Sequence, residues 1–340
     1  MKAVVYRSYG NPESVLRVED IPRPRVGPHD VLVRVRASTV NLDDLQYVRG
    51  EIFIRPGAWR QPKHMILGSD IAGTVEAVGD RVPRIRAGDD VMADLTGLGF
   101  GAFAEYVAVP ARALAWKPAA LSFEEAACVP TAGVRAYQGL TGKGPLRPGD
   151  HVLVNGAGGG LGSFAIQIAK AVGATVTGVD AGSKFDVMRA AGADHVLDYT
   201  QGHYSESGGR FDLILDVAAY GSLNDFRSVV RSKRVLTPNG RYVLYLAGGG
   251  IADRVFTTVL LQGWMKARGG RKLSILHGAP NRPADVARVT EMIDSGAVRP
   301  IIDRSFPLHE IAEALLYVER GAAKGKVVVA IDEAGDREPN

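Results

Sequence analysis

The sequence predicts an α/β protein with two domains, one built on a doubly wound parallel sheet and one made mainly of short β-strands. The first observation is the stretch from residue 150 to residue 180, DHVLVNGAGGGLGSFAIQIAKAVGATVTGVD, which has the pattern strand, glycine-rich turn, helix, strand. The second is the alternation of strand and helix patterns that continues after residue 180. The third is the length of 340 residues, which is enough for two domains that each bury a core.

Residues 1 to about 118 are expected to form a compact barrel-like domain. Short apolar runs alternate there with turn clusters such as Tyr9-Gly10-Asn11-Pro12. A helical pattern follows over residues 122–140, and Pro145, Pro148 and Gly149 end it just before the second domain. The expected strands of the first domain cover residues 2–6, 31–37, 71–78, 90–93 and 104–109.

The glycine-rich turn is the candidate nucleotide site. The strand expected over residues 151–155 has an apolar run at 152–154 suited to a strand covered on both faces, and the helix expected over residues 161–172 carries an apolar stripe. Glycines let a pyrophosphate approach the backbone, and the helix N-terminus behind them offers N–H groups and a positive dipole end. The usual spacing Gly-x-Gly-x-x-Gly is met only as Ala157-x-Gly159-x-x-Gly162, so the prediction depends on the strand and helix around it. The candidate cofactor-binding residues of the turn are Gly156, Gly159, Gly160, Leu161 and Gly162.

Asp180 follows the second strand of this unit, expected over residues 175–179. A carboxylate there can accept hydrogen bonds from both ribose hydroxyls of NADH, and it would oppose the 2′-phosphate of NADPH. Considered alone, Asp180 therefore favours NADH.

The chain after residue 180 continues the parallel sheet and then changes pattern. Gly248, Gly249 and Gly250 follow one of its strands at the edge where ligands bind, either for a close approach to the nicotinamide or as an ordinary loop. The expected helices of the sheet domain cover residues 183–191 and 222–231, and its strands cover 195–198, 211–217, 240–246 and 272–277. The tail is expected to return to the first domain through helices at 284–295 and 309–319 and strands at 298–304 and 326–331.

Composition predicts a soluble, cytoplasmic protein. Apolar residues make up 46% and charged residues 23% of the chain, which is ordinary for a globular protein. The net charge of +4 comes from lysines and arginines scattered among acids, so no nucleic-acid surface is predicted. The single cysteine, Cys128, excludes an internal disulfide and a cysteine zinc cluster and fits a reducing compartment. No signal core or long apolar run is present, and the apolar and basic segment 255–272 is interpreted as a pocket lid or subunit contact in preference to a membrane-surface helix.

Several motifs together resemble one known family, the medium-chain dehydrogenase/reductases, and within it the zinc-free branch around quinone oxidoreductase and the related NAD(P)-dependent alcohol dehydrogenase-like proteins. The resemblance implies a GroES-like β-barrel catalytic domain from residues 1–124 and 280–340, a Rossmann NAD(P)-binding domain from residues 125–279, and an active site in the cleft. The motifs are GSDIAGTVEAVG (68–79), AGDDVMA (87–93), GAFAEY (101–106), NGAGGGLGSFAIQIAK (155–170), GADHVLDY (192–199), FDLILDV (211–217) and GKVVVAI (325–331).

The resemblance also allows zinc to be tested. The metal-binding Cys-x-x-Asp run of zinc-dependent members is matched here by Asn41-Leu42-Asp43-Asp44, and their Gly-His-Glu by Gly68-Ser69-Asp70. Cys128 is matched to their third ligand, and one soft ligand of three cannot hold a catalytic zinc. We therefore predict no metal site, with Cys128 as a buried small residue and His64 as a turn or surface histidine.

The predicted activity is zinc-independent, NAD(P)H-dependent hydride transfer to a quinone, an enone or another conjugated carbonyl. Without a metal a simple ketone lacks its Lewis acid, whereas a conjugated system spreads the developing charge onto an oxygen that neutral donors can stabilise. The resemblance places Asn41 beside the nicotinamide as such a donor, the alternative being a residue that caps a turn. Tyr47 is a second candidate donor, at a slightly different offset from the family's tyrosine.

Four further residues are candidates for cofactor binding. Lys184 matches a lysine that binds the 2′-phosphate, with Ser183 beside it, and the alternative for Lys184 is a solvated charge at a helix start. Tyr199 ends the GADHVLDY motif. Arg135 replaces a threonine that faces the carboxamide, and it either binds the pyrophosphate, binds an acidic substrate or points to solvent. Both nucleotides are therefore expected to bind, with a slight preference for NADH.

The expected assembly is a homodimer formed by pairing of the edge strand at residues 272–277 with its copy. The expected partner is a small conjugated carbonyl or quinone, with no nucleic acid and no stable membrane insertion. There are two alternatives to the hypothesis of a quinone or enone reductase. One is a secondary-metabolism tailoring reductase that acts on a larger substrate, and the other is a nucleotide-binding scaffold of the same fold without turnover.

Overall fold

The structure is a computed structural model that describes residues 1–51, 61–142, 146–218, 229–245, 271–276 and 282–331. The chain divides into two compact units. The first unit comprises Met1–Thr131, Pro280–Thr290 and Ile302–Asn340, and the second comprises Ala132–Ala279 and Glu291–Ile301. We describe each unit by itself.

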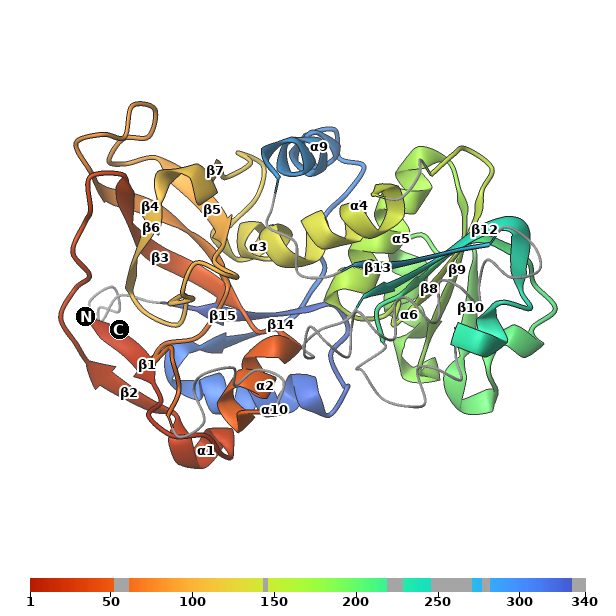
Figure 1. The fold of residues 1–340 in the computed structure, drawn as a ribbon, viewed down its shortest axis with the longest axis horizontal. Coiled ribbons are helices and arrows are strands. Elements are labelled where there is room, and N and C mark those ends of the chain that lie inside the picture. Colours follow the sequence, from red (N-terminus) through yellow and green to blue (C-terminus); the bar gives the residue numbers. More distant parts are fainter. Residues whose placement is uncertain (52–60, 143–145, 219–228, 246–270, 277–281, 332–340) are drawn as a thin grey trace, which may run out of the picture. The chain divides into compact units, whose positions relative to one another are not determined.

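The second unit contains a six-stranded, entirely parallel sheet with the strand order β10-β9-β8-β11-β12-β13. This order is that of a doubly wound nucleotide-binding sheet, as predicted. Helices α4 (Val134–Thr141) and α5 (Gly160–Val172) pack against each other beside it (Figure 1). The strands are β8 (His151–Asn155), β9 (Thr175–Asp180), β10 (His195–Asp198), β11 (Phe211–Asp216), β12 (Leu236–Tyr245) and β13 (Lys272–Leu276).

Local sequence explains the unit formed by β8, α5 and β9. The apolar centre of β8 is completely buried because both faces of the sheet are covered. Phe164 and Ile168 lie one turn apart on the buried face of α5. Gly173 ends the helix with φ of 92°, a left-handed conformation that favours glycine. A Cβ on Gly162 would lie 2.2 Å from the carbonyl oxygen of Gly156, so only glycine allows this close approach of helix and strand.

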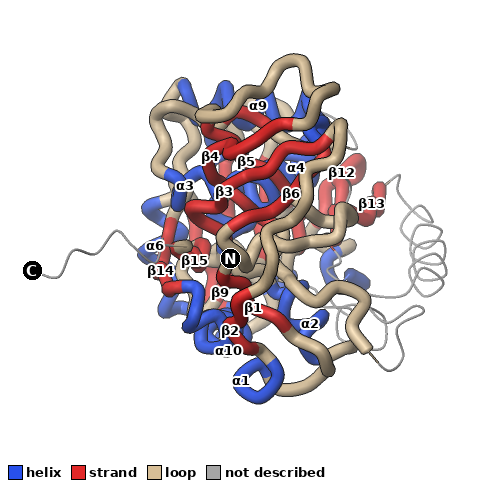
Figure 2. Tube along the Cα trace, turned by 90° about the vertical axis from the view of Figure 1, so that its left-hand side faces the viewer, coloured by secondary structure: helices blue, strands red, loops and turns tan. Residues whose placement is uncertain are grey.

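The first unit is mainly β. One sheet has the order β14-β15-β3-β4-β5-β7, with β6 paired to β3, and β1 and β2 form a separate antiparallel pair (Figure 2). The strands are β1 (Lys2–Val5), β2 (Arg17–Asp20), β3 (Asp30–Thr39), β4 (Asp70–Val78), β5 (Asp90–Asp94), β6 (Tyr106–Pro110), β7 (Ala115–Trp116), β14 (Ile302–Pro307) and β15 (Lys326–Ala330). Its helices include α1 (Pro12–Val15), α2 (Leu42–Arg49), α3 (Phe123–Ala127) and α10 (Ile311–Glu319). Helix α9 (Pro283–Asp294) belongs to the first unit up to Thr290 and to the second from Glu291.

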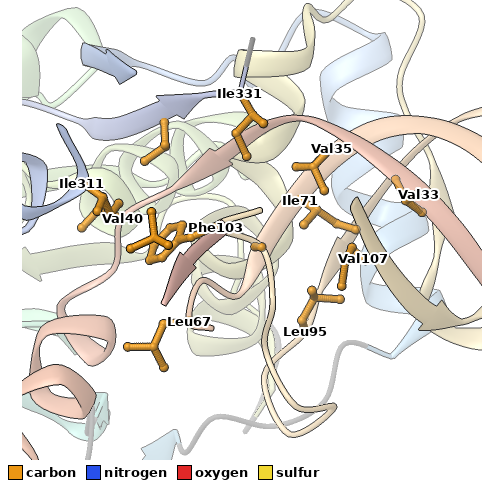
Figure 3. Packing of buried hydrophobic residues seen from close by; sticks show 14 of the residues in the cluster. Val33, Val35, Val40, Leu67, Ile71, Leu95, Phe103, Val107, Ile311 and Ile331 are labelled. Carbon is orange, nitrogen blue, oxygen red and sulfur yellow. The ribbon is translucent and has the colours of Figure 1, made fainter. Parts of the chain in front are cut away.

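The core of the first unit lies inside this curved sheet. Val33 and Val35 from β3, Ile71 from β4 and Val107 from β6 pack together with Phe103 (Figure 3). Irregularities in the register of β3 against β4 bend the sheet around this cluster. The GroES-like, barrel-type domain predicted from the sequence is thus present.

Several predicted elements differ in extent from the structure, and two of these differences have a clear local cause. The single helix expected over residues 122–140 is α3, a π-helical turn at Val129–Gly133, and α4. Pro130 has no N–H group, so the regular helical bonding cannot continue through it. The strand expected from residue 298 begins at Ile302 as part of β14, because Pro300 cannot donate to a ladder.

The sequence reading missed helices α1 and α2 and strands β2 and β7. Most of the helix expected at 222–231, the glycines 248–250 and nearly all of segment 255–272 lie outside the described residues. Within the part of the chain that the structure describes, no helix is both long and apolar enough to cross a membrane.

Candidate functional site

The glycine-rich turn of the second unit has the geometry of an anion site. Gly156 leaves β8 with φ of 84°, and Gly159 stands before the first turn of α5 without a side chain to cap its N–H groups. Among the described residues, only the Gly156 carbonyl oxygen, at 3.7 Å, would lie near a Cβ on Gly159. These residues therefore leave space over the helix N-terminus, lined by backbone donors, which fits the pyrophosphate of a dinucleotide. Gly160, Leu161 and Gly162 supply this first turn, as the sequence predicts for the cofactor.

Asp180 closes this turn from the end of β9. Its Oδ2 accepts a hydrogen bond from the Gly158 N–H at 2.9 Å, and its Oδ1 accepts one from the Ala181 N–H at 2.8 Å. The Lys184 Nζ lies 3.4 Å from Oδ1, and both side chains are largely buried. Lys184 is therefore not a solvated charge but the partner of Asp180. Gly158, whose Cβ would lie 2.7 Å from the Lys184 side chain, leaves the space in which this lysine packs.

The other two cofactor candidates near β9 lie at the surface. Ser183 is exposed in a 3₁₀ turn at Gly182–Lys184, and Tyr199 is 59% exposed at the start of the turn Tyr199–Gln201. Asp198 precedes Tyr199 at the end of β10, and hydrogen bonds from Thr200 hold the pKa of the Asp198 carboxyl below its usual value. These residues surround the carboxyl ends of β9 and β10.

Arg135 is not a solvent-facing residue. It is 1% exposed, and a guanidinium N–H donates a hydrogen bond to the Tyr245 hydroxyl at 2.6 Å. Tyr245 ends β12, so the guanidinium is held at the carboxyl edge of the parallel sheet, where ligands bind in this architecture. Of the three alternatives from the sequence, solvent exposure is excluded.

A buried polar network that the sequence reading did not identify ties three strands of this sheet together. Asp216 at the end of β11 accepts hydrogen bonds from the Asn155 side chain at 2.9 Å and from the Tyr242 hydroxyl. Burial and the nearby Asp216 raise the pKa of Tyr242. The signal in the sequence was the acid that ends the apolar run FDLILD, since a strand-end carboxylate in a buried sheet needs partners.

In the first unit, Asn41 is the centre of a second polar cluster. It precedes α2, and its backbone N–H donates to Asp44 Oδ2 at 2.9 Å, so the predicted capping role is present at a helix instead of a turn. Its Nδ2 donates to Asp70 Oδ2 at 2.9 Å and to Ser69 Oγ at 3.1 Å. Its Oδ1 accepts a hydrogen bond from Lys326 Nζ at 2.8 Å. The side-chain amide is thus held at both ends.

Asp70 carries the negative charge of this cluster and is 0% exposed. It accepts hydrogen bonds from Thr39 Oγ1 at 2.6 Å and from the Thr131 N–H at 2.8 Å. Its counter-ion is Lys326, which is 4% exposed and lies 3.5 Å from Oδ2. Lys326 was missed from the sequence, although a lysine that opens the buried run KVVVA is itself an indication of an internal partner. Burial raises the pKa of the neighbouring Asp44 to about 7.

The residues matched to metal ligands do not fit a zinc ion. Asn41 and Asp70 both bind the Lys326 ammonium. The positive charge that a zinc ion would place beside the Asp70 carboxylate is therefore already provided by a lysine. Cys128 is buried, as predicted, its thiol donates to the Glu124 carbonyl, and burial raises its pKa to about 12, which disfavours the thiolate that binds metal. Among the described residues, no group of three or more His, Cys, Asp or Glu side chains could hold a metal.

Tyr47 lies on α2, in the same unit as Asn41. Its ring packs edge-on against Phe100, with 4.9 Å between ring centroids, and Phe100 has a φ of 62°. The His64 ring lies edge-on to the same Phe100 ring, with 5.4 Å between ring centroids, and partial burial lowers the pKa of this histidine. Of the two predicted substrate donors, Asn41 is thus the N-cap residue of α2 and Tyr47 lies within this helix.

A dinucleotide turn on a doubly wound sheet and a buried hydrogen-bonding cluster on a GroES-like barrel define a nicotinamide-dependent oxidoreductase. Comparison with known families agrees. Residues 27–119 match the family described as "Alcohol dehydrogenase GroES-like domain", and residues 191–329 match that described as "Zinc-binding dehydrogenase".

Three similar proteins show to which kind of oxidoreductase the chain is related. The chain is 31% identical to a mitochondrial NAD(P)H oxidoreductase of Mus musculus, over 97% of this chain and 89% of that protein. It is also 31% identical to a chloroplastic NADPH-dependent alkenal/one oxidoreductase of Arabidopsis thaliana, over 97% of this chain and 79% of that protein. The solved structure of the quinone oxidoreductase from Coxiella burnetii matches with a TM-score of 0.84 at 26% identity, over 98% of this chain and 99% of that one. The chain belongs to the medium-chain dehydrogenase/reductase superfamily, in its quinone oxidoreductase-like branch.

Proposed function

We propose that the protein catalyses zinc-independent hydride transfer from NAD(P)H to a quinone, an enone or another conjugated carbonyl. The observation that carries this proposal is the cluster of Asn41, Ser69, Asp70 and Lys326, in which an internal ammonium binds two of the residues matched to the metal-binding motifs, Asn41 and Asp70. A conjugated acceptor needs only hydrogen-bond donors at its oxygen, and this cluster offers them. The names of the Arabidopsis and Coxiella relatives support the same substrate class.

Each unit has a defined part in this proposal. NAD(P)H, when bound, supplies the hydride. The turn Gly156–Gly162 binds its pyrophosphate, Asp180 and Lys184 face its adenosine ribose, and Ser183, Tyr199 and Arg135 remain candidate contacts. The Asn41 cluster stabilises the negative charge that develops on the acceptor oxygen, with Tyr47 as a second donor. Both nucleotides are proposed to be used, and the cytoplasmic location stays a prediction.

The test of this function is turnover with matched substrates. We expect the purified protein to oxidise NADH or NADPH in the presence of a simple quinone or cyclohexenone, at a rate that a zinc chelator does not change. Cyclohexanone is the control, since it has the same ring without the conjugated double bond and should be a poor substrate. Zinc bound in stoichiometric amount and lost together with activity would contradict the proposal. Tight nucleotide binding without turnover over a broad carbonyl panel would favour the scaffold alternative.

We also propose that the protein is a homodimer. β13 lies at one edge of the parallel sheet, next to β12, and an exposed edge strand is a liability unless another chain covers it. Two-fold pairing of β13 with its copy would cover both edges at once. Light scattering at micromolar concentration is expected to give twice the mass of the chain, and a monomer mass would contradict this assembly.

A further inference from the structure

The orientation of the Asn41 side chain is fixed by charge. Its Oδ1 faces the Lys326 ammonium and its Nδ2 faces the Asp70 carboxylate. The flipped amide would place an oxygen against the carboxylate and hydrogens against the ammonium, so both contacts would become repulsive. A buried ion pair therefore selects one of the two orientations of this amide.

Both hydrogens of the Asn41 amide are already used. One is donated to Asp70 Oδ2 and the other to Ser69 Oγ. Asn41 has no further side-chain hydrogen for a substrate, because a primary amide carries only two. Ser69, which is 5% exposed, accepts through its oxygen and keeps its own hydroxyl hydrogen for another acceptor. Among the described residues, the bond from Asn41 is the one that this hydroxyl makes.

The three residues form a chain of polarised hydrogen bonds. Lys326 donates to the amide oxygen, which strengthens Nδ2–H as a donor, and the hydroxyl that accepts from Nδ2 becomes a stronger donor in turn. The buried Lys326 ammonium thus polarises the Ser69 hydroxyl through two successive side-chain contacts, Lys326 to Asn41 and Asn41 to Ser69. Low exposure keeps water from screening this polarisation.

We propose that Ser69 donates the hydrogen bond to the carbonyl or quinone oxygen of the substrate, and that Lys326 is a positioning residue that orients and polarises Ser69 through Asn41. This inference rests on the proposed function and names the donor within it. Ser69 keeps its proton, so no bond to this residue forms or breaks during hydride transfer. The hydroxyl stabilises charge that develops on the acceptor oxygen.

The direct test compares Ser69→Ala with Ser69→Thr. Removing the hydroxyl is expected to lower kcat by ~100-fold, with little change in KM or in nucleotide affinity, because the lost interaction matters most in the transition state. Thr keeps a hydroxyl and should retain most of the rate. An Ala variant that folds, binds nucleotide and keeps its kcat would overturn the proposal.

The role of Lys326 needs a charge-balanced variant. Lys326→Met alone leaves the buried Asp70 carboxylate without its counter-ion and risks unfolding, so the pair Lys326→Met/Asp70→Asn removes both charges together. We expect this pair to lower kcat. Its effect on kcat should not add to that of Ser69→Ala, since both changes remove the same chain of hydrogen bonds from Lys326 to the substrate oxygen. The exposed Lys324→Met is the matched control and should behave as the wild type. Additive losses would show that Lys326 does not act through Ser69.

NMR of the Asn41 side-chain amide needs no substrate, so it tests the hydrogen bonds from Lys326 to Ser69 independently of the proposed activity. In protein labelled with ¹⁵N-asparagine, the two side-chain amide hydrogens of Asn41 should give distinct, slowly exchanging signals. Ser69→Ala should move mainly one of them, and the charge-balanced pair should move both. Signals that do not change would overturn this chain of hydrogen bonds even in an active enzyme. An inactive wild type with the expected signals would instead reject the proposed function, and the donor role of Ser69 with it, while the positioning by Lys326 would stand.

Discussion

Gly159→Asp is expected to leave the fold intact while weakening nucleotide binding by ~1,000-fold. The backbone of Gly159 has φ of −89° and ψ of −179°, which any residue can adopt, and among the described residues the nearest atom to an added Cβ is 3.7 Å away. Aspartate is a preferred residue at the start of a helix, so the apoprotein should be at least as stable. Its charge, however, would stand where a phosphate must bind, and two like charges at about 4 Å cost ~4 kcal/mol at an effective dielectric near 20.

Fluorescence titration with NADH and NADPH measures this loss, and thermal unfolding reports the fold. Gly159→Asn is the matched variant, because it has nearly the same shape without the charge and should lose much less affinity. Gly162→Ala should instead lower the stability of the fold, because its Cβ would lie 2.2 Å from the Gly156 carbonyl oxygen. Wild-type affinity in Gly159→Asp would show that the pyrophosphate binds elsewhere.

The second large effect concerns the choice of nucleotide. Asp180→Ser is expected to raise kcat/KM for NADPH by about tenfold or more and to lower it for NADH. The carboxylate repels a 2′-phosphate and at the same time holds Lys184 at 3.4 Å, so its removal both lifts the repulsion and releases a cation for the phosphate. NADH loses an acceptor for its ribose hydroxyls.

Kinetics with both nucleotides check this prediction. Lys184→Met is the informative partner, because methionine keeps the stem that packs over Gly158 and removes only the charge. This variant should lose activity with NADPH more than with NADH, opposite in sign to Asp180→Ser. If the ratio of the two kcat/KM values stays unchanged in Asp180→Ser, then Asp180 does not face the ribose, and its hydrogen bond to Gly158 is purely structural.

The nucleotide-binding half of the fold was predictable because its signals are local. β8 has the predicted bounds, and α5 and β9 differ from theirs by one residue each, since an apolar run, a glycine turn and a helical stripe lie within thirty-one consecutive residues. Helix α2 was missed because its pattern of apolar residues is weak, and only the Asn41 and Asp44 pair marks its start.

The polar cluster of the first unit could be predicted only in part. The matches to metal ligands brought Asn41, Ser69 and Asp70 together in the sequence reading, but not Lys326, which bonds to Asn41 across 285 residues. No periodicity or spacing reports a contact of that range. The same limit applies to Arg135, whose burial depends on Tyr245, 110 residues away. The residue types of Lys326 and Arg135 show that each position carries a positive charge. Their partners, Asn41 and Tyr245, are known only from the fold.

The position of β15 between β14 and β3 has a consequence for synthesis on the ribosome. When β3 and β4 emerge, Asp70 has no ammonium partner, and on the edge away from β4 the Ala37–Thr39 part of β3 has no pairing strand until Lys326–Ala330 is translated, because β6 covers only Asp30–Arg34 on that edge. The six parallel strands of the second unit are complete before that point, so this unit can fold first, while the first unit still lacks β15 and the counter-ion of Asp70. Until β15 is released, the incomplete first unit therefore presents an unpaired stretch of strand, which is the kind of feature that promotes aggregation of a nascent chain.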